Sequence, residues 1–276
     1  MSADDSPSGI LLVDKPVGPT SHDIVSRVRR ALGTRRVGHA GTLDPFASGL
    51  LIVVLGRATR LARYFVDLPK TYEVVIQLGA TSSTGDPEGE IVQTANVPER
   101  LELPLGRIRQ RPPAHSAVKV DGERAYARAR RGEDVQTAER EVTVHESELR
   151  WREGDRAGLR FVCSSGTYVR SLVADLGDAY CLELRRSAIG PFEAQGAWPG
   201  EGIPDPMAIE TAWPRFAPTL HLSAEETRLA AHGRPLPAQG IAGAALLLDP
   251  AGAPVAIASE REGALRVDVG LSSPAP

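Results

Sequence analysis

The pattern of apolar and polar residues predicts short strands and helices that alternate along the chain. Residues 9–14 (GILLVD) form an apolar run that ends at Lys15-Pro16, as a buried strand ends at a turn. Residues 21–32 then place apolar side chains at helical spacing and stop at Gly33, after a Thr-Ser pair that can cap a helix. The chain therefore begins with a strand and an amphipathic helix.

The same reasoning extends to residue 189. We expect further strands at residues 50–55, 71–78, 90–94, 141–151, 158–163 and 182–189, and helices at 57–65, near 98–110, from about 124 and at about 167–180. The strand at 71–78 should pair with 90–94 through a Gly- and Asp-rich turn, whereas residues 35–49 lack periodicity and predict a loop. These elements indicate an α+β fold with a mixed, mainly antiparallel sheet and flanking helices.

A change of composition near residue 195 predicts a second unit. Residues 195–207 contain three glycines and three prolines, which is typical of a linker. Beyond a short helix near Ala208, apolar runs at 244–248, 254–258 and 265–269 predict strands. We expect a large domain at 1–194, a linker region at 195–215 and a small β-rich domain at 216–276.

Composition excludes several classes of protein. The 276 residues are enough for one large domain or a large and a small one, and no apolar run approaches the roughly 18 residues that span a membrane. The acidic, polar N-terminus differs from a signal peptide, so we expect a cytoplasmic protein. Cys163 and Cys181 are too few for a disulfide framework, and the histidines lack metal-ligand spacing, so we predict reduced thiols and no metal site.

Charge is distributed unevenly along the chain. The net charge of −3 argues against a nucleic-acid partner, but residues 193–276 hold ten acidic and five basic residues, which leaves +2 for residues 1–192. Within that part, residues 24–43 hold five arginines and no acid, and residues 105–131 hold eight basic and two acidic residues. This distribution favours a locally basic face that binds phosphates.

Asp44 is the first candidate for chemistry. It lies in the expected loop within a Leu-Asp-Pro sequence, and because Asp-Pro is a common turn initiator, these residues alone favour a structural role. The surrounding sequence changes this balance. Nearby glycines allow a substrate to approach closely, and Arg36, His39 and Thr42 add hydrogen-bond donors.

Five blocks of sequence carry a resemblance to a known family. The segment GHAGTLDPFASGLLIVVLGRATRL at 38–61 resembles the catalytic motif of the bacterial tRNA pseudouridine-55 synthase family. Four other blocks stand in the family order. One precedes this segment, GILLVDKPVGPTSHDIV, and three come after it: KTYEVVIQLGATSSTGDPEG, RPPAHSAVKVDGERAYARARRG and SSGTYVRSLVADLG. Together the blocks cover residues 9 to about 192.

The resemblance implies a reaction and three catalytic residues. Uracil is detached from its ribose at N1, rotated and rejoined through C5, which requires a carboxylate nucleophile and no cofactor. Asp44 matches the family nucleophile, and Arg170 matches the arginine that pairs with it. Tyr72 matches the tyrosine that stacks on a flipped-out uracil, and its hydroxyl could also serve proton transfer.

Further positions match residues that bind the substrate or support the site. His39 matches a histidine that fills the space left by flipped nucleotides, and Tyr168 and Leu184 match residues that line the uracil pocket. Lys15 and Pro16 match a pair that supports the catalytic loop. Asp86 also matches a family aspartate, although a turn role is sufficient to explain it. The chain departs from the family at His115, where a tyrosine is usual, and has a shorter segment before Leu184.

The implied function is isomerisation of uridine 55 in the TΨC loop of tRNA, with tRNA as the partner, no membrane association, no metal, and a monomeric enzyme. The tail resembles a small RNA-binding domain of the PUA type. Two other functions stay open at this point: an RNA-binding module without catalysis, and a base-removing hydrolase. The hydrolase commonly needs a second carboxylate, and none lies near Asp44 in sequence. Whether Asp44 attacks C1′ or C6, or first acts as a base, is also open.

Overall fold

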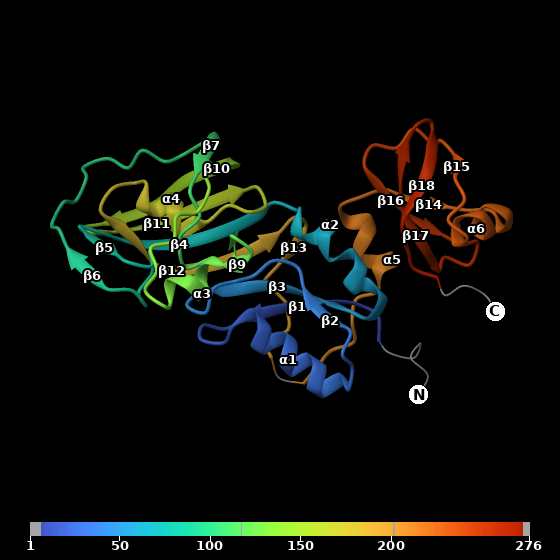
Figure 1. Ribbon diagram of the computed structural model, residues 1–276, viewed down its shortest axis with the longest axis horizontal. Coiled ribbons are helices and arrows are strands. Elements are labelled where there is room, and N and C mark those ends of the chain that lie inside the picture. Colours follow the sequence, from blue (N-terminus) through green and yellow to red (C-terminus); the bar gives the residue numbers. More distant parts are fainter. Residues whose placement is uncertain (1–6, 117, 201, 273–276) are drawn as a thin grey trace.

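The computed structural model describes residues 7–116, 118–200 and 202–272, which form two large sheets, two small two-stranded sheets and the helices packed around them (Figure 1). The main sheet has the order β1-β3-β12-β4-β11-β10-β7, with β2 beside β3 and β13 beside β12. These strands are β1 Gly9–Lys15, β2 Val37–His39, β3 Ser48–Leu55, β4 Lys70–Leu78, β7 Gly106–Gln110, β10 Arg140–Glu153, β11 Arg156–Cys163, β12 Ala179–Ile189 and β13 Phe192–Glu193. Only β12 and β3 pair in parallel among these described strands, so the expected mixed, mainly antiparallel sheet is confirmed.

The strands show why the sequence alternates in one place and is continuously apolar in another. In β4, Tyr72, Val74 and Ile76 are buried while the side chains between them are half-buried, because one face of the sheet is covered. In contrast, β3 is apolar throughout, since its two faces belong to two different cores. The first helix, α1 Ser21–Leu32, packs on one of these faces, and α2 Ala62–Val66 packs on the other.

The helices are short, and the first has well-defined ends. Thr20 and Asp23 form a reciprocal capping box at the start of α1, and Gly33 ends the helix in the left-handed conformation (φ 59°). The remaining helices are a 3-10 helix at Gly56–Leu61, α3 Ala125–Ala129, α4 Val169–Ala174, α5 Ile209–Ala212, a 3-10 helix at Trp213–Arg215 and α6 Ala224–Ala231.

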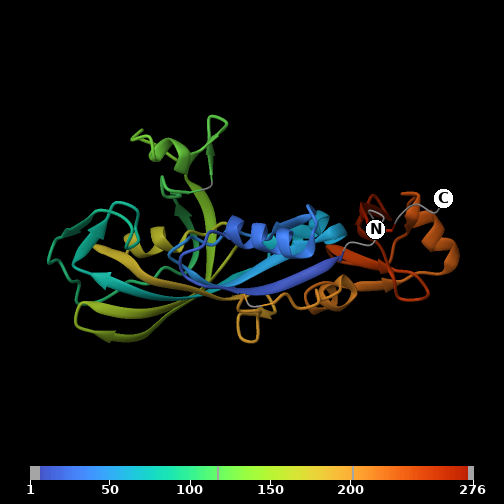
Figure 2. The same ribbon diagram turned by 90° about the horizontal axis from the view of Figure 1, so that it is seen from below.

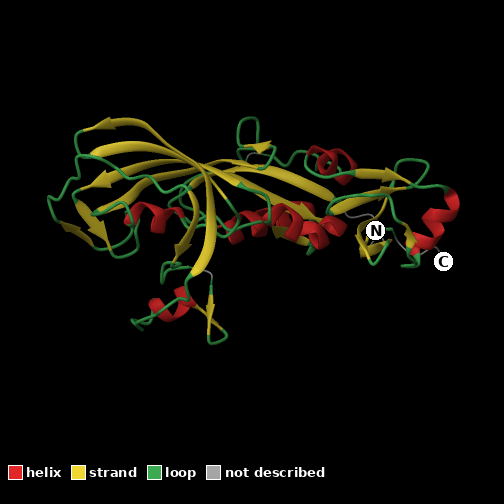
Figure 3. Cartoon of the chain, turned by 90° about the horizontal axis from the view of Figure 1, so that it is seen from above, coloured by secondary structure: helices red, strands yellow, loops and turns green. Residues whose placement is uncertain are grey.

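A separate segment projects away from the main sheet. It contains the two-stranded pair β8 Lys119–Val120 and β9 Glu123–Arg124, followed by α3. Figures 2 and 3 show that this segment extends from the sheet on the side where α1 lies. Ser116, at the base of this segment, lines a cavity together with Asp44 of the loop between β2 and β3.

Three predicted elements were wrong. Residues 98–105 are not helical, and 106–110 form β7. Leu101 and Leu103 pack on the core two residues apart, and Ile108 packs there from β7, so the apolar contacts do not follow a helical period. The strand β6 Ile91–Gln93 pairs with β5 Ala80–Ser82 instead of β4, since Gly79 (φ 72°) turns the chain out of the main sheet. The expected loop at 35–49 contains the short strand β2.

The C-terminal residues form a second sheet that shares a core with the first. Its order is β14-β16-β17-β18-β15, with strands β14 Thr219–His221, β15 Leu236–Pro237, β16 Ala244–Leu248, β17 Pro254–Arg261 and β18 Ala264–Gly270. Leu246 and Ile257 of this sheet belong to the same buried cluster as Leu50 and Ile52 of β3. The residues expected as a linker also pack closely, because Trp198 bridges to Val13 and is only 8% exposed.

Candidate active site

Asp44 lies in the loop between β2 and β3, and neighbouring elements hold this loop on both sides. The Ser21 hydroxyl, at the start of α1, accepts a hydrogen bond from the Leu43 amide at 2.9 Å and donates to the Leu43 carbonyl at 3.1 Å. The Gly18 amide donates to the Pro45 carbonyl at 2.8 Å. The backbone on each side of Asp44 is therefore fixed by residues from the first strand-helix unit.

Arg170, on α4, joins Asp44 to a second carboxylate. Its Nη2 lies 2.9 Å from Asp44 Oδ2, and its Nη1 lies 3.1 Å from Asp86 Oδ2. The side chains of Arg170 and Asp86 are 5% and 6% exposed, whereas that of Asp44 is 32% exposed. Asp44 is thus the accessible end of this network, and Asp86 is its buried anchor.

The remaining hydrogen bonds of Arg170 go to the main chain. Its Nη1 donates to the Thr84 carbonyl at 2.7 Å, and its Nη2 donates to the His115 carbonyl at 2.9 Å. Because the contact at residue 115 uses the carbonyl, it does not depend on the histidine that replaces the family tyrosine. Asp86 in turn accepts from the Thr84 hydroxyl at 2.5 Å and the Glu88 amide at 3.1 Å. The guanidinium is therefore held in place before any substrate binds.

A cavity of about 250 Å³ brings five of the predicted residues together. It is lined by Asp44, Tyr72, Tyr168, Arg170 and Leu184. This volume is below the roughly 300–1,000 Å³ typical of pockets for drug-sized ligands, so it suits a small group such as a single base. These residues come from the loop before β3, from β4, from α4 with the residue before it, and from β12.

Tyr72 forms one wall of the cavity from the covered face of the sheet. It is 9% exposed and lies opposite Arg186 in the register between β4 and β12. Burial raises the pKa of Tyr72, and the positive charge of Arg186 partly opposes this shift. The phenol is therefore protonated at neutral pH in the free protein. Leu184 lies opposite Val74 on the same face, 7% exposed.

Tyr168 is fixed through both its backbone and its ring. Its amide donates to the buried Gln110 side chain at 2.7 Å, and the Gln110 amide group donates back to its carbonyl at 3.0 Å. The Arg140 guanidinium lies 4.7 Å from the centre of its ring. Residues of β7 and β10 thus position a side chain of the cavity.

His39 lies at the end of β2, outside the residues that line the cavity. Its ring meets that of His22 edge to face, with 5.3 Å between ring centres. Burial, His22 and Arg186 lower the pKa of His39 to about 4, and its Nδ1 has no hydrogen-bond partner among the described residues. His39 is therefore a neutral ring at pH 7, and the structure does not bring it into direct contact with the cavity.

Lys15 is fully buried behind the catalytic loop. Its Nζ donates to the carbonyls of Pro16, Pro19 and Pro45 at 2.8, 3.0 and 3.5 Å. Burial lowers the pKa of Lys15 to about 8, although the charge of Asp44 opposes this shift. The ring of Pro16 is exposed, so this residue contributes its carbonyl and its turn geometry.

Three residues of the site were not singled out as functional from the sequence. Asp86 was explained as a turn residue, yet it is also the ion-pair partner of Arg170. Lys70 and Arg186 line the cavity, and they were not considered. A signal for Lys70 existed, because the chain contains only three lysines and 29 arginines. Only the sheet register could have shown that Arg186 shares a face with Tyr72.

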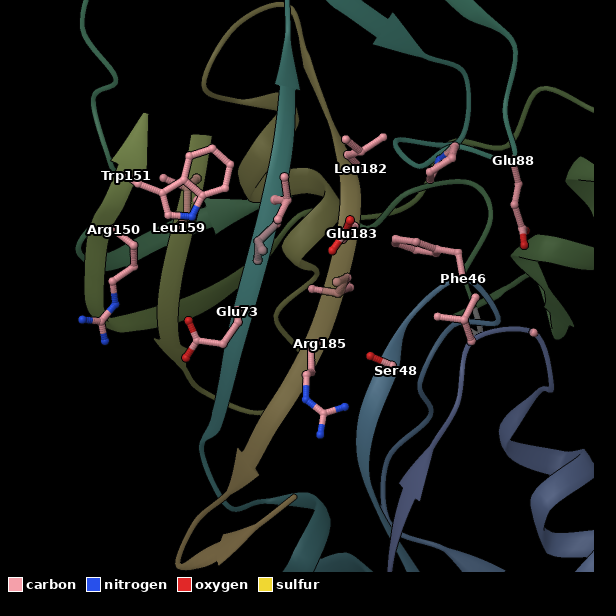
Figure 4. A pocket seen from close by; sticks show the side chains of 17 residues that line it. Phe46, Ser48, Glu73, Glu88, Arg150, Trp151, Leu159, Leu182, Glu183 and Arg185 are labelled. Atoms are coloured by element: carbon pink, nitrogen blue, oxygen red, sulfur yellow. The ribbon is translucent and has the colours of Figure 1, made fainter. Parts of the chain in front are cut away.

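A larger cavity of about 710 Å³ opens on the other face of the sheet (Figure 4). Glu73 and Arg185 line it, and they alternate along their strands with Tyr72 and Arg186, so they point away from the site. Of the predicted site residues it contains only Leu184. We therefore assign the chemistry to the smaller cavity that contains Asp44.

The two basic stretches differ in the structure. The five arginines of α1 and the following turn are exposed, and none forms an ion pair within the described part of the chain: Arg27, Arg29, Arg30, Arg35 and Arg36. In the stretch at 105–131, Arg128 and Arg131 pair with Asp121, Glu123 and Glu133. Much of the second stretch is therefore neutralised locally. The first stretch, which we call the α1 arginine patch, has no described carboxylate paired with any of its five arginines.

The structure shows no helix that is long and apolar enough to cross a membrane among the residues it describes. The same residues contain no group of three or more His, Cys, Asp or Glu side chains that could hold a metal ion.

Comparison with known proteins identifies the family. A sequence model described as "TruB family pseudouridylate synthase (N terminal domain)" matches residues 29–169. The tRNA pseudouridine synthase B of Thermobifida fusca is 43% identical over 279 residues, which cover 92% of this chain and 95% of the relative. The chain belongs to the TruB family of pseudouridylate synthases.

Other relatives extend this similarity over most of the chain. The tRNA pseudouridine synthase B of Corynebacterium aurimucosum is 39% identical over 92% of this chain and 93% of its own length. Among solved structures, a Cbf5-Nop10-Gar1 complex contains a chain that aligns with a TM-score of 0.71 and 25% identity, covering 98% of this chain and 87% of that one. The family fold therefore includes the C-terminal sheet as well as the matched N-terminal part.

Proposed function

We propose that this protein isomerises uridine 55 in the TΨC loop of tRNA to pseudouridine, with Asp44 as nucleophile. The observation that carries the proposal is the pairing of a partly accessible carboxylate with a buried, fixed guanidinium beside an aromatic wall, in one cavity of nucleobase size. Membership of the TruB family, whose curated relatives are named tRNA pseudouridine synthase B, supports the reaction and the tRNA substrate.

The geometry supports a division of roles between the residues. The target base has to leave the RNA stack, at a cost of a few kcal/mol, before a side chain in this cavity can reach it. Stacking on an aromatic ring, worth about 1–3 kcal/mol per base, offsets much of that cost, and Tyr72 and Leu184 supply the wall. Arg170 pairs with Asp44 and aims it. His39 lies outside the cavity and is proposed to fill the space that the flipped nucleotides vacate in the RNA.

The base-removing hydrolase is disfavoured by the place of the second carboxylate. Asp86 lies in the same network as Asp44, but it is 4% exposed and does not line the cavity. Its oxygens already accept hydrogen bonds from Arg170, Thr84 and Glu88. Asp86 is therefore an anchor for Arg170 and cannot act as an acid or base on the substrate.

The chain is proposed to consist of a catalytic domain at 1–194, a linker region at 195–215 and a PUA-like domain at 216–276. The α1 arginine patch and the PUA-like domain are proposed to form the RNA-binding face. The enzyme is further proposed to be a monomer, and light scattering of the purified protein tests this. A tRNA substrate supports a cytoplasmic location.

The deciding experiment compares wild type with Asp44→Ala on unmodified tRNA. We expect wild type to form pseudouridine at position 55 without a change in RNA mass, and the variant to form none while it keeps its affinity for tRNA. Pseudouridine mapping and mass spectrometry measure the two quantities. Turnover by Asp44→Ala would refute the role of Asp44, and loss of mass would indicate base removal. Product at another site or in another RNA would keep the reaction and change the substrate.

A further inference from the structure

The wall of the catalytic cavity contains two buried cations that the Asp44–Arg170–Asp86 network does not use. Arg186 is 1% exposed and Lys70 is 5% exposed, and both line the cavity. Within the described ranges, neither side chain forms an ion pair with a carboxylate. Arg186 donates to the main-chain carbonyls of Gly41, Thr42 and Leu50 and also interacts with the Tyr72 hydroxyl. Lys70 donates to the main-chain carbonyls of Val66 and Leu68.

The cavity therefore holds more positive than negative charge. The Asp44–Arg170–Asp86 network has two negative charges and one positive charge, and Arg186 and Lys70 add two positive charges. These two cations are held by carbonyl dipoles, and the charge of Asp67 also acts on Lys70. Burial of a cation without a counter-ion costs several kcal/mol. A cation that is shielded from water in this way interacts strongly with any negative charge that appears in the cavity during the reaction.

The proposed reaction produces negative charge at this place. When the bond between C1′ and N1 breaks, its electron pair stays on N1, and the detached uracil becomes an anion with charge shared between N1 and the two carbonyl oxygens. C1′ loses electron density, and the Asp44 carboxylate can bond to it. After rotation, C5 bonds to C1′ while the bond between C1′ and Asp44 breaks and returns its electron pair to the carboxylate. The proton on C5 then leaves, and N1 takes up a proton. The base is neutral at the beginning and the end, so it is anionic only between these steps.

We propose that Arg186, assisted by Lys70, stabilises the negative charge that uracil carries while it is detached from its ribose. This inference rests on the proposed function and adds to it an electrostatic partner for the base. Arg186 is suited to the task because three carbonyls hold its guanidinium, at 2.7 Å from Leu50 O and 3.2 Å from Gly41 O and Thr42 O. A preorganised charge of this kind stabilises a developing anion without reorganising during the reaction.

The register of the sheet places this charge beside the wall on which the base would stack. Arg186 on β12 lies opposite Tyr72 on β4, and both side chains are buried on the same face. Lys70 is two residues before Tyr72 on the same strand and therefore shares that face. The next residue of β12, Arg185, points to the other face and pairs with Asp14 at 2.7 Å. Arg185 is thus a matched control, an arginine on the same strand that cannot reach the cavity.

The test measures single-turnover cleavage of the C1′–N1 bond in tRNA with either uridine or 5-fluorouridine at position 55. Fluorine withdraws electrons and stabilises the detached base, so a protein cation is needed less. For Arg186→Gln we expect a rate about 100-fold below wild type with uridine, the size seen when one donor to a developing anion is removed. With 5-fluorouridine we expect the loss to be about tenfold smaller, as leaving-group stabilisation implies. Arg185→Gln should change neither rate more than about twofold, since it changes only an exposed pair.

Two further variants keep the test decisive. If Arg186→Gln does not fold, as judged by thermal melting and tRNA binding, Lys70→Met provides the same comparison of the two substrates. Repeating Arg186→Gln in a Tyr72→Phe background shows whether Arg186 acts on the base directly or through the Tyr72 hydroxyl. If Arg186→Gln no longer lowers the rate in that background, Arg186 acts through Tyr72 and the proposal is overturned.

Two further outcomes would distinguish failure of this inference from failure of the proposed function. Equal losses on uridine and 5-fluorouridine would reduce Arg186 to a structural clamp for residues 41–42, and would leave the proposed function intact. Absence of pseudouridine with the wild-type protein would instead refute the proposed function itself.

Discussion

Replacing Asp86 by Asn should destabilise the protein far more than replacing the nucleophile Asp44 by Asn. Asp86 is 6% exposed at its side chain and accepts hydrogen bonds from the Arg170 guanidinium, the Thr84 hydroxyl and the Glu88 amide. Removal of one partner from a buried ion pair costs about 3–5 kcal/mol, because the other charge is left without compensation. Arg170 keeps Asp44 as a partner, so we expect the lower end, about 3 kcal/mol of unfolding free energy.

The measurement is a thermal or urea unfolding curve at pH 7 for three variants. About 3 kcal/mol corresponds to a fall in melting temperature of roughly 6–12 °C for chains of 150–250 residues, and this chain should lie near the lower value. The matched control is Asp14→Asn, which also removes a carboxylate bound by an arginine. Because the side chains of Asp14 and Arg185 are 30% and 42% exposed, its loss should cost about 1 kcal/mol or less.

Activity provides the second half of this prediction. Asp86→Asn should lower the single-turnover rate at saturating tRNA, because Arg170 loses the anchor that aims it at Asp44, while tRNA affinity changes little. The reasoning would be refuted if Asp86→Asn were no more destabilising than Asp14→Asn. It would also fail if Asp44→Asn, at a side chain that is 32% exposed, were the most destabilising of the three.

Three further predictions follow from the same structure. Burial lowers the pKa values of Lys15 and Lys70 from 10.5 to about 8, so the unfolded chain binds more protons than the folded chain between pH 8 and 10.5. The free energy of unfolding should therefore rise with pH over that range. Lys70→Met should reduce this rise, as measured by urea titrations at several pH values. Gly49→Ala should lower the melting temperature much more than Gly106→Ala, because a Cβ at Gly49 would lie 2.3 Å from a carbonyl oxygen of β12, whereas Gly106 has open space, although both have positive φ. Affinity for tRNA should fall steeply with salt, and each Arg→Gln change in the α1 arginine patch should reduce the slope of log K against log salt by up to about 0.9 in binding titrations; an unchanged slope would remove the patch from the RNA-binding face.

Local patterns were sufficient for most of the strands. The alternation at 71–78 and the continuous run at 50–55 both predicted strands, and they correctly differed because one strand is covered on one face and the other on two. The helix expected near 98–110 failed because Leu101 and Leu103 pack on the core two residues apart, a spacing that does not fit one face of a helix. Pairing failed where a single glycine, Gly79, redirected the chain.

The family motifs identified the residues that meet in the cavity. They assigned no such role to Asp86, which anchors Arg170, or to Lys70 and Arg186, which add positive charge to the cavity wall. Asp44, Tyr72 and Arg170 stand in short motifs whose residue types suit the chemistry. Asp86 was visible as a motif residue, but its second role as an ion-pair partner depends on α4 bringing Arg170 across the hairpin that contains Asp86. Counting charges along the chain did not show which arginines are paired, because Glu133, outside the counted stretch, pairs with Arg128 and Arg131.

The amino-acid sequence by itself determined the order of the elements, the antiparallel character of the sheet and the family motifs, since these depend on side-chain periodicity and on residues close together in the chain. Only the tertiary structure decided the electrostatics of the site. Arg186 and Lys70 share a face with Tyr72 because of the register between β12 and β4, and each is buried without a carboxylate because of what packs around that face. Coulomb energy depends on distance and on exclusion of water, and neither quantity can be read from separation along the chain.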